Sequence, residues 1–178
     1  MRRLLMTAGA LCAALMLSTG AFAQVPPDPN NPNETVPEKY NYTPYGENIK
    51  LDQAKKVADA ALAEATKRSW PMCISVVDTS GELVYFEKMD QCQYASIEIS
   101  QNKGRAAARY RRPTLVFERL MGKGPFFSYL PTLGAGFVGS RGGNPIIVGG
   151  KIVGAIGVSG GTGSQDDTIS QAGANALQ

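Results

Sequence analysis

The chain has 178 residues, with 18 Lys and Arg against 15 Asp and Glu, and it contains no histidine. The lack of histidine excludes Ser-His and Cys-His catalytic pairs, imidazole zinc sites and histidine ligation of haem. A formal net charge of only +3 falls short of the dense basic surface that nucleic-acid binding requires, so we expect no nucleic-acid partner.

Residues 1–23 have the three parts of a cleavable signal peptide: Arg2 and Arg3, an apolar stretch over residues 4–17, and a small-x-small site ending at Ala23. The apolar stretch is shorter than the about 20 residues that span a bilayer. Cleavage would lower Lys and Arg from 18 to 16 against 15 acidic residues, a net charge of +1 on 155 residues. We therefore expect a periplasmic or secreted domain without membrane attachment after cleavage; an uncleaved N-terminal anchor is the alternative.

Residues 24–50 hold six of the eleven prolines, and this composition predicts an extended N-terminal arm. Two readings of the arm stay open. It is either a flexible leader, or its C-terminal part docks through Tyr40, Tyr42 and Tyr45 onto the domain or a neighbouring subunit.

From residue 51 onward, apolar periodicity predicts helices and hairpins in alternation. Residues 51–69 repeat alanine and valine at helical spacing, which indicates one amphipathic helix. Residues 72–78 and 83–89 are predicted strands around a turn that contains Gly81. Residues 94–112 form a predicted second helix, and a short third helix begins at residue 114.

Seven glycines interleaved with aromatic residues mark residues 122–143 as a long, shaped loop. A second hairpin follows, with strands at 144–148 and 151–159 around Gly149 and Gly150. A last helix begins near residue 164, where Ser164 and Asp167 have capping-box spacing. A further strand could lie within residues 133–142. The order predicts an α+β domain over residues 51–178, an antiparallel sheet covered by helices.

After signal cleavage two cysteines remain, Cys73 and Cys92. An oxidising compartment would favour a disulfide between them. If Cys73 faces Lys88 across the first hairpin, however, Cys92 lies about four residues beyond Lys88. At about 3.3 Å per residue this offset exceeds the reach of a disulfide, unless the chain folds back after Met89. A Cys73–Cys92 bridge and two buried thiols are both open on these grounds.

Several motifs resemble the GlcG/HbpS family, which includes the C-terminal domain of PduO-type proteins. They are the sequence GGNPI from Gly142, the sequence GAIGVSG from Gly154, the VVDTSGELV hairpin and the helix around Lys103. The resemblance covers about residues 50–178. It implies a profilin-like antiparallel sheet of about five strands, frequently a homo-oligomer, and in some members haem binding.

The resemblance places Lys103 at the family's lysine position, with Arg105 and Arg109 nearby on the same predicted helix. Together they would clamp the propionates of haem or another small carboxylate. A solvated or subunit-facing basic surface is the alternative. Family position alone also suggests that Asp166 pairs with Lys103, and these two residues would act if the protein were an enzyme.

The aromatic residues Phe126, Phe127, Tyr129 and Phe137 are candidates for the wall of an apolar ligand pocket, although core or subunit packing would equally account for them. Several haem-binding members of the family use histidine around the iron, and this chain has none. Haem, the candidate cofactor, would need a Met, Tyr, Cys or Lys ligand, or propionate and ring contacts alone. Met89 and Met121 are the thioethers to test first.

The leading hypothesis is an exported protein that binds haem or another carboxylated small molecule without catalysis. The alternatives are a periplasmic enzyme that acts on a small oxidised carbon compound through Lys103, or an oligomeric accessory protein for a periplasmic dehydrogenase. An enzyme without histidine would need a lysine or carboxylate to transfer the proton.

Overall fold

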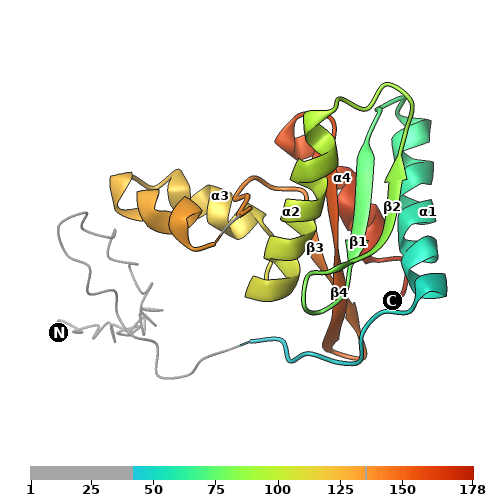
Figure 1. The fold of residues 1–178 in the computed structure, drawn as a ribbon, viewed down its shortest axis with the longest axis horizontal. Coiled ribbons are helices and arrows are strands. Elements are labelled where there is room, and N and C mark those ends of the chain that lie inside the picture. The colour runs from blue at the N-terminus through green and yellow to red at the C-terminus, as the bar shows by residue number, and fades with distance from the viewer. Residues whose placement is uncertain (1–41, 135) are drawn as a thin grey trace, which may run out of the picture.

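A four-stranded antiparallel sheet forms the centre of the computed structural model, which describes residues 42–134 and 136–178 (Figure 1). The elements in chain order are α1 (Leu51–Lys67), β1 (Cys73–Val77), β2 (Leu83–Lys88), α2 (Ala95–Tyr110), α3 (Leu115–Met121), the 3-10 helix η1 (Pro125–Thr132), β3 (Gly143–Val148), β4 (Lys151–Ser159) and α4 (Gly163–Ala174). The strand order is β2-β1-β4-β3. The expected α+β class is confirmed, while the predicted signal peptide and most of the arm lie outside the described residues.

The sheet has four strands in the described residues, one fewer than the expectation of about five. Residues 133–142, where a further strand could have lain, run as turns and loop where they are described. Gly136 and Gly142 have φ angles of 75° and 114°, which strand residues do not adopt. The glycines of this segment therefore shape a loop, as their density had also suggested.

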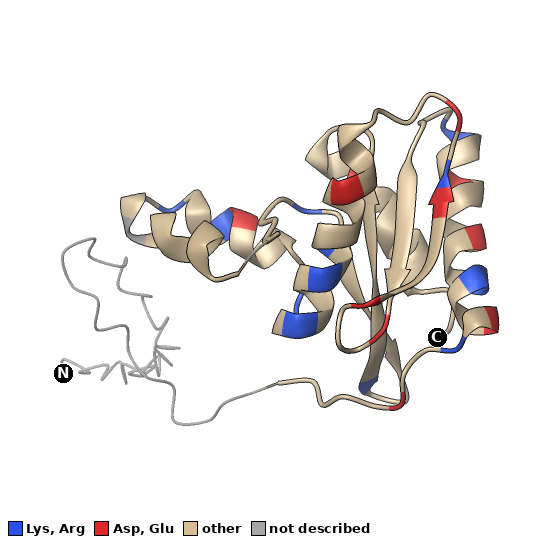
Figure 2. Ribbon diagram, viewed as in Figure 1, with Lys and Arg blue, Asp and Glu red and all other residues tan. Residues whose placement is uncertain are grey.

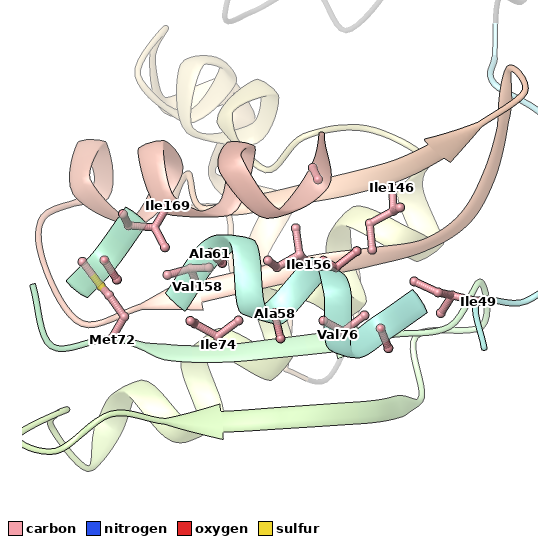
Figure 3. Close-up of a cluster of buried hydrophobic side chains, with 14 residues drawn as sticks. Ile49, Ala58, Ala61, Met72, Ile74, Val76, Ile146, Ile156, Val158 and Ile169 are labelled. Atoms are coloured by element: carbon pink, nitrogen blue, oxygen red, sulfur yellow. The ribbon is translucent and has the colours of Figure 1, made fainter. Parts of the chain in front are cut away.

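Helices α1 and α4 cover one face of the sheet and enclose the main hydrophobic core (Figures 1 and 3). The buried stripe of α1 consists of Ala54, Val57, Ala58, Ala61 and Ala65. Its small side chains allow the helix axis to approach the sheet closely. Branched side chains of the strands fill the space beneath, among them Ile74, Val76, Ile156 and Val158, all fully buried.

Helix α2 covers the opposite face and lies almost backbone to backbone against β4. A side chain at Gly157 would collide with the carbonyl oxygen of Ser100 and the backbone of Gly104. The buried face of α2 is accordingly made of small and polar residues, including Ser96, Ser100 and Ala107. This close approach places the C-terminal half of α2 over the middle of the sheet.

The first hairpin has the predicted pairing of Cys73 with Lys88, with an irregularity between Val76 and Val77. The chain then folds back: the Cys92 amide donates to the Met89 carbonyl at 3.1 Å, and Gln91 takes a φ of 67°. This turn brings the Cα atoms of Cys73 and Cys92 to 5.9 Å, and the two sulfurs form a disulfide. The disulfide ties the start of β1 to the loop that leads into α2.

Residues 44–49 of the arm lie along the first residues of β4. The Ile152 amide donates to the Pro44 carbonyl at 2.9 Å, and the Gly46 and Ile49 amides donate to the carbonyls of Ile152 and Val153. The Tyr45 hydroxyl donates to the carbonyl oxygens of Ala108 and Arg109 at the end of α2, at 2.9 and 3.1 Å. This part of the arm therefore docks onto the domain.

Helix α4 begins at a different cap from the one expected. Thr162 is the N-cap, and its amide donates to the side-chain oxygen of Gln165 at 2.8 Å, which completes a capping box. The predicted pair Ser164 and Asp167 lies two residues further on. In the described part of the chain, none of the helices has the length and apolarity needed to cross a membrane.

Candidate functional site

Helix α2 presents its predicted site residues on two different sides. Arg105 and Arg109 are one turn apart and share a face, whereas Lys103 lies about 200° around the axis from Arg105. Lys103 points into the protein and is 1% exposed. Figure 2 shows the positive residues of α2 gathered toward its C-terminal end, where the arm also docks. The three residues therefore do not form one cluster.

The buried side of α2 holds an ion pair between Lys103 and Asp166 of α4. Lys103 Nζ lies 2.7 Å from Asp166 Oδ2, and the two side chains are 2% and 4% exposed. The Gly161 amide also donates to Asp166 Oδ1 at 3.0 Å. Burial raises the pKa of the Asp166 carboxyl, against the opposing effects of Lys103 and the amides of Gly161 and Gly160.

This ion pair connects α2 to the start of α4 beneath the glycines that precede β3. A side chain at Gly142 would come within 3.0 Å of Lys103 Nζ and 2.8 Å of Asp166 Cβ. No open space is left beside the charges on that side. The family position thus placed Lys103 and Asp166 together, and the structure seals them from solvent rather than presenting them to a substrate.

A second, more exposed ion pair lies nearby, between Glu118 of α3 and Arg141. Arg141 Nε donates to Glu118 Oε1 at 2.7 Å, and the Arg141 amide donates to Glu118 Oε2 at 2.8 Å. The side-chain hydrogen bond from Arg141 is the main cause that lowers the pKa of Glu118 below its ordinary value of 4.5. The pair fixes the loop before β3 to α3.

Replacing Glu118 by glutamine should make stability less dependent on pH on the acid side. Because the folded pKa is lowered, this carboxylate stabilises the protein above about pH 4.5, and the contribution, under about 1 kcal/mol, is lost as pH falls through the folded pKa. Urea unfolding midpoints measured from neutral to acidic pH would show a flatter curve for Glu118→Gln. Glu47→Gln, at an exposed carboxyl, is the control, and superimposable wild-type and Glu118→Gln profiles would contradict the prediction.

The outer face of α2 borders a pocket of about 410 Å³ between this helix and the loop that follows η1. The lining residues are Arg105, Ala106, Arg109, Tyr110, Leu133, Gly134, Gly136 and Phe137. The Tyr110 hydroxyl donates to the Leu133 carbonyl at 3.3 Å and joins the loop to the helix. The pocket therefore has a cationic side on α2 and an apolar, aromatic side on the loop.

Both arginines of the pocket are held by neighbouring polar groups. Arg105 Nη1 donates to Asn102 Oδ1 at 2.7 Å. Arg109 Nε donates to the Ser80 carbonyl at 2.6 Å, and Arg109 Nη2 donates to Glu82 Oε1 at 2.9 Å. These bonds orient the guanidinium groups and leave each of them further N–H donors for a ligand. A carboxylate is the group that such paired donors bind best.

Phe127 and Tyr129, two of the predicted aromatic residues, do not line the pocket. Phe127 is 3% exposed in a small core with Phe117 and Leu130, formed where α3 and η1 project from the domain (Figure 1). Tyr129 is 46% exposed on the same projection. Only the backbone of Phe126 is described. Packing within the projection accounts for Phe127 without a ligand.

The two methionines proposed as iron ligands are also not among the residues that line the pocket. Met89 packs against the main core, and its sulfur accepts the Met72 amide at 3.4 Å. Met121 packs against the small core of the projection. Within residues 42–134 and 136–178, no group of three or more Cys, Asp or Glu residues is arranged to hold a metal ion.

Sequence reasoning overlooked Tyr110 and Leu133 as site residues. The spacing of residues on the helix could have identified Tyr110. Arg109 lies four residues after Arg105, Tyr110 lies four residues after Ala106, and residues four apart share a helix face. Leu133 had no such signal, since its place depends on how the loop returns to α2. Phe137, which was considered as a pocket wall, does line the pocket.

Comparison with known proteins shows which family has this architecture. The model of a family described as haem degrading protein HbpS-like matches residues 49–175. The chain belongs to the HbpS-like family. Protein GlcG of Escherichia coli (strain K12) is 38% identical to this HbpS-like chain over 112 residues, which are 62% of the chain and 81% of GlcG. The expected resemblance is thereby confirmed.

Solved structures share the HbpS-like fold. The Klebsiella pneumoniae protein ORFY superposes with a TM-score of 0.68 at 27% identity, covering 78% of this chain and 97% of ORFY. The protein in the PduOC:haem complex superposes with a TM-score of 0.67 at 22% identity, covering 74% of this chain and 96% of PduOC. At that identity the second likeness concerns the fold alone.

Proposed function

We propose that this HbpS-like protein is an exported, non-catalytic binder of a carboxylate-bearing small molecule, with haem as the first ligand to test. The observation that carries the proposal is the pocket that Arg105 and Arg109 line together with Tyr110 and Phe137. The description of the family supports haem as the first candidate. The predicted signal peptide supports export.

The pocket residues fit the two chemical parts of haem. Arg105 and Arg109 would bind the propionates, and the rings of Tyr110 and Phe137 would contact the porphyrin. A volume of about 410 Å³ lies toward the lower end of the range of about 300–1,000 Å³ for ligand pockets. The pocket would therefore enclose only part of a porphyrin, whereas a smaller carboxylate would be enclosed. Bound haem would bring a redox-active iron to the protein.

Binding is favoured over catalysis by the composition of the pocket. The lining residues include no carboxylate and no lysine. The enzyme alternative required Lys103 as a base, yet Lys103 is 1% exposed and bonded to Asp166 on the other side of α2. General acid-base catalysis requires the group to reach the substrate within hydrogen-bond distance.

Titration of the mature protein with haemin should give a saturable shift of the Soret band. Arg105→Ala and Arg109→Ala should each weaken binding about tenfold or more, because a hydrogen bond to a charged group contributes about 1.5–3 kcal/mol. Arg68→Ala, at the C-cap of α1 and outside the pocket, removes the same charge and should bind as the wild type does.

A calorimetric titration with benzoate tests whether the same pocket binds a small carboxylate. Saturable binding of either haemin or benzoate that is weakened in the two pocket variants supports the proposal. If neither probe binds saturably, or if Arg68→Ala weakens binding as much as the pocket variants do, the proposal is rejected.

A further inference from the structure

We infer that Tyr110 is the residue that binds the iron when haem occupies the α2 pocket. This inference rests on the proposed function and adds an iron ligand to it. It answers a question that the sequence raises, since a chain without histidine lacks the commonest protein ligand of haem iron.

The lining residues of the pocket include no cysteine, methionine or lysine, the other candidate ligands of haem iron. Cys73 and Cys92 are joined in a disulfide and offer no thiolate. Met89 lies in the main core and Met121 in the core of the projection, and neither lines the pocket. Among the eight lining residues, Tyr110 alone carries a group of the kind that haem proteins use, a phenol oxygen.

The surroundings of Tyr110 hold its ring in one orientation. The ring makes edge contacts with Phe117 and Phe137, at centroid distances of 5.2 and 5.8 Å. Its hydroxyl makes one long hydrogen bond of 3.3 Å to the Leu133 carbonyl at the pocket wall. A ring fixed by packing, with a weakly held hydroxyl at the cavity, is a preorganised ligand.

The pocket also supplies charge compensation for a bound phenolate. On binding, the Tyr110 hydroxyl would release its proton to solvent, and its oxygen would donate an electron pair to ferric iron in place of the water or hydroxide that haemin carries in solution, which is released, without any change in oxidation state. The guanidinium groups of Arg105 and Arg109, which line the same pocket, offset the negative charges of phenolate and propionates. The hydrogen bond to Leu133 would be given up in exchange.

Tyr110→Phe tests the inference, because it removes the oxygen and retains the ring contacts. The wild-type complex with haemin should show the visible charge-transfer band and the iron-phenolate Raman modes of a ferric tyrosinate, and Tyr110→Phe should lose both. Since loss of an outer-shell partner alone typically costs about 10–100-fold in metal affinity, the affinity of Tyr110→Phe for haemin should fall at least about tenfold. Affinity for metal-free protoporphyrin IX should be unchanged. Tyr129→Phe, at a tyrosine outside the pocket lining, is the control, and thermal unfolding verifies that both variants are folded.

The outcomes separate this inference from the proposed function. If haemin binds no more tightly than protoporphyrin IX, or if Tyr110→Phe retains the wild-type spectrum and affinity, Tyr110 is not the iron ligand, while propionate binding at the arginines stands. If neither porphyrin binds saturably, haem binding fails and the inference fails with it. Loss of the tyrosinate signature in Tyr129→Phe would likewise overturn it.

Discussion

Replacing Asp166 by alanine should lower the free energy of unfolding by about 3–5 kcal/mol, because it leaves a buried ammonium group without its partner. The Lys103 side chain is 2% exposed, and its ion pair with Asp166 spans 2.7 Å. The substitution also removes the acceptor of the Gly161 amide. Urea denaturation at neutral pH, followed by circular dichroism, measures the loss.

A double variant shows whether the unpaired charge causes the loss. Lys103→Met combined with Asp166→Ala removes both charges, and it should recover a large part of the stability that Asp166→Ala loses. Glu82→Ala breaks the exposed pair with Arg109 and should cost no more than about 1 kcal/mol. An Asp166→Ala cost as small as that of Glu82→Ala would show that Asp166 is not buried in solution as it is in the structure.

Removing the disulfide should cost about 3 kcal/mol of unfolding free energy. Cys73 and Cys92 are 19 residues apart, and closing a loop of that length restricts the unfolded chain. The variant Cys73→Ala/Cys92→Ala should therefore unfold at a lower urea concentration than the oxidised wild type.

Reduction of the wild-type protein provides the matched comparison. Dithiothreitol should lower the wild-type midpoint to about that of Cys73→Ala/Cys92→Ala and leave the double variant unaffected. Thiol labelling of the denatured, unreduced mature protein should find no free cysteine. Two labelled thiols per chain, or a wild-type midpoint that does not respond to dithiothreitol, would contradict the structure at this point.

The sequence predicted those helices and strands whose characteristic residue patterns lie within the element itself or in its turn. Helix α1 follows from its alanine stripe, and both hairpins follow from their turns; Gly149 and Gly150 indeed take positive φ angles of 55° and 75°. The inner face of α2 had no such signal, because Ser96, Ser100 and Lys103 are not apolar. That face is buried through contact with the backbone of β4, which apolar periodicity does not detect.

The site was predictable to the extent that helix geometry determines it. Arg105 and Arg109 are one turn apart and line the same pocket, as their spacing requires. Lys103 was grouped with them because of its nearness in sequence, but it faces Asp166, which is 63 residues away along the chain. The pocket wall on the loop depends on long-range packing of a glycine-rich segment. The periodicity of apolar residues in the sequence does not predict such packing.

The docked arm determines where a shortened version of this protein can begin. A protein cut at Leu51 would lose the backbone partners of Ile152 and Val153 and the hydroxyl that bonds to the last carbonyls of α2. It would also lose Ile49, which is 4% exposed in the main core. Unpaired strand edges recruit other strands, so such a truncated protein should aggregate. A soluble recombinant form therefore has to start at or before Pro44.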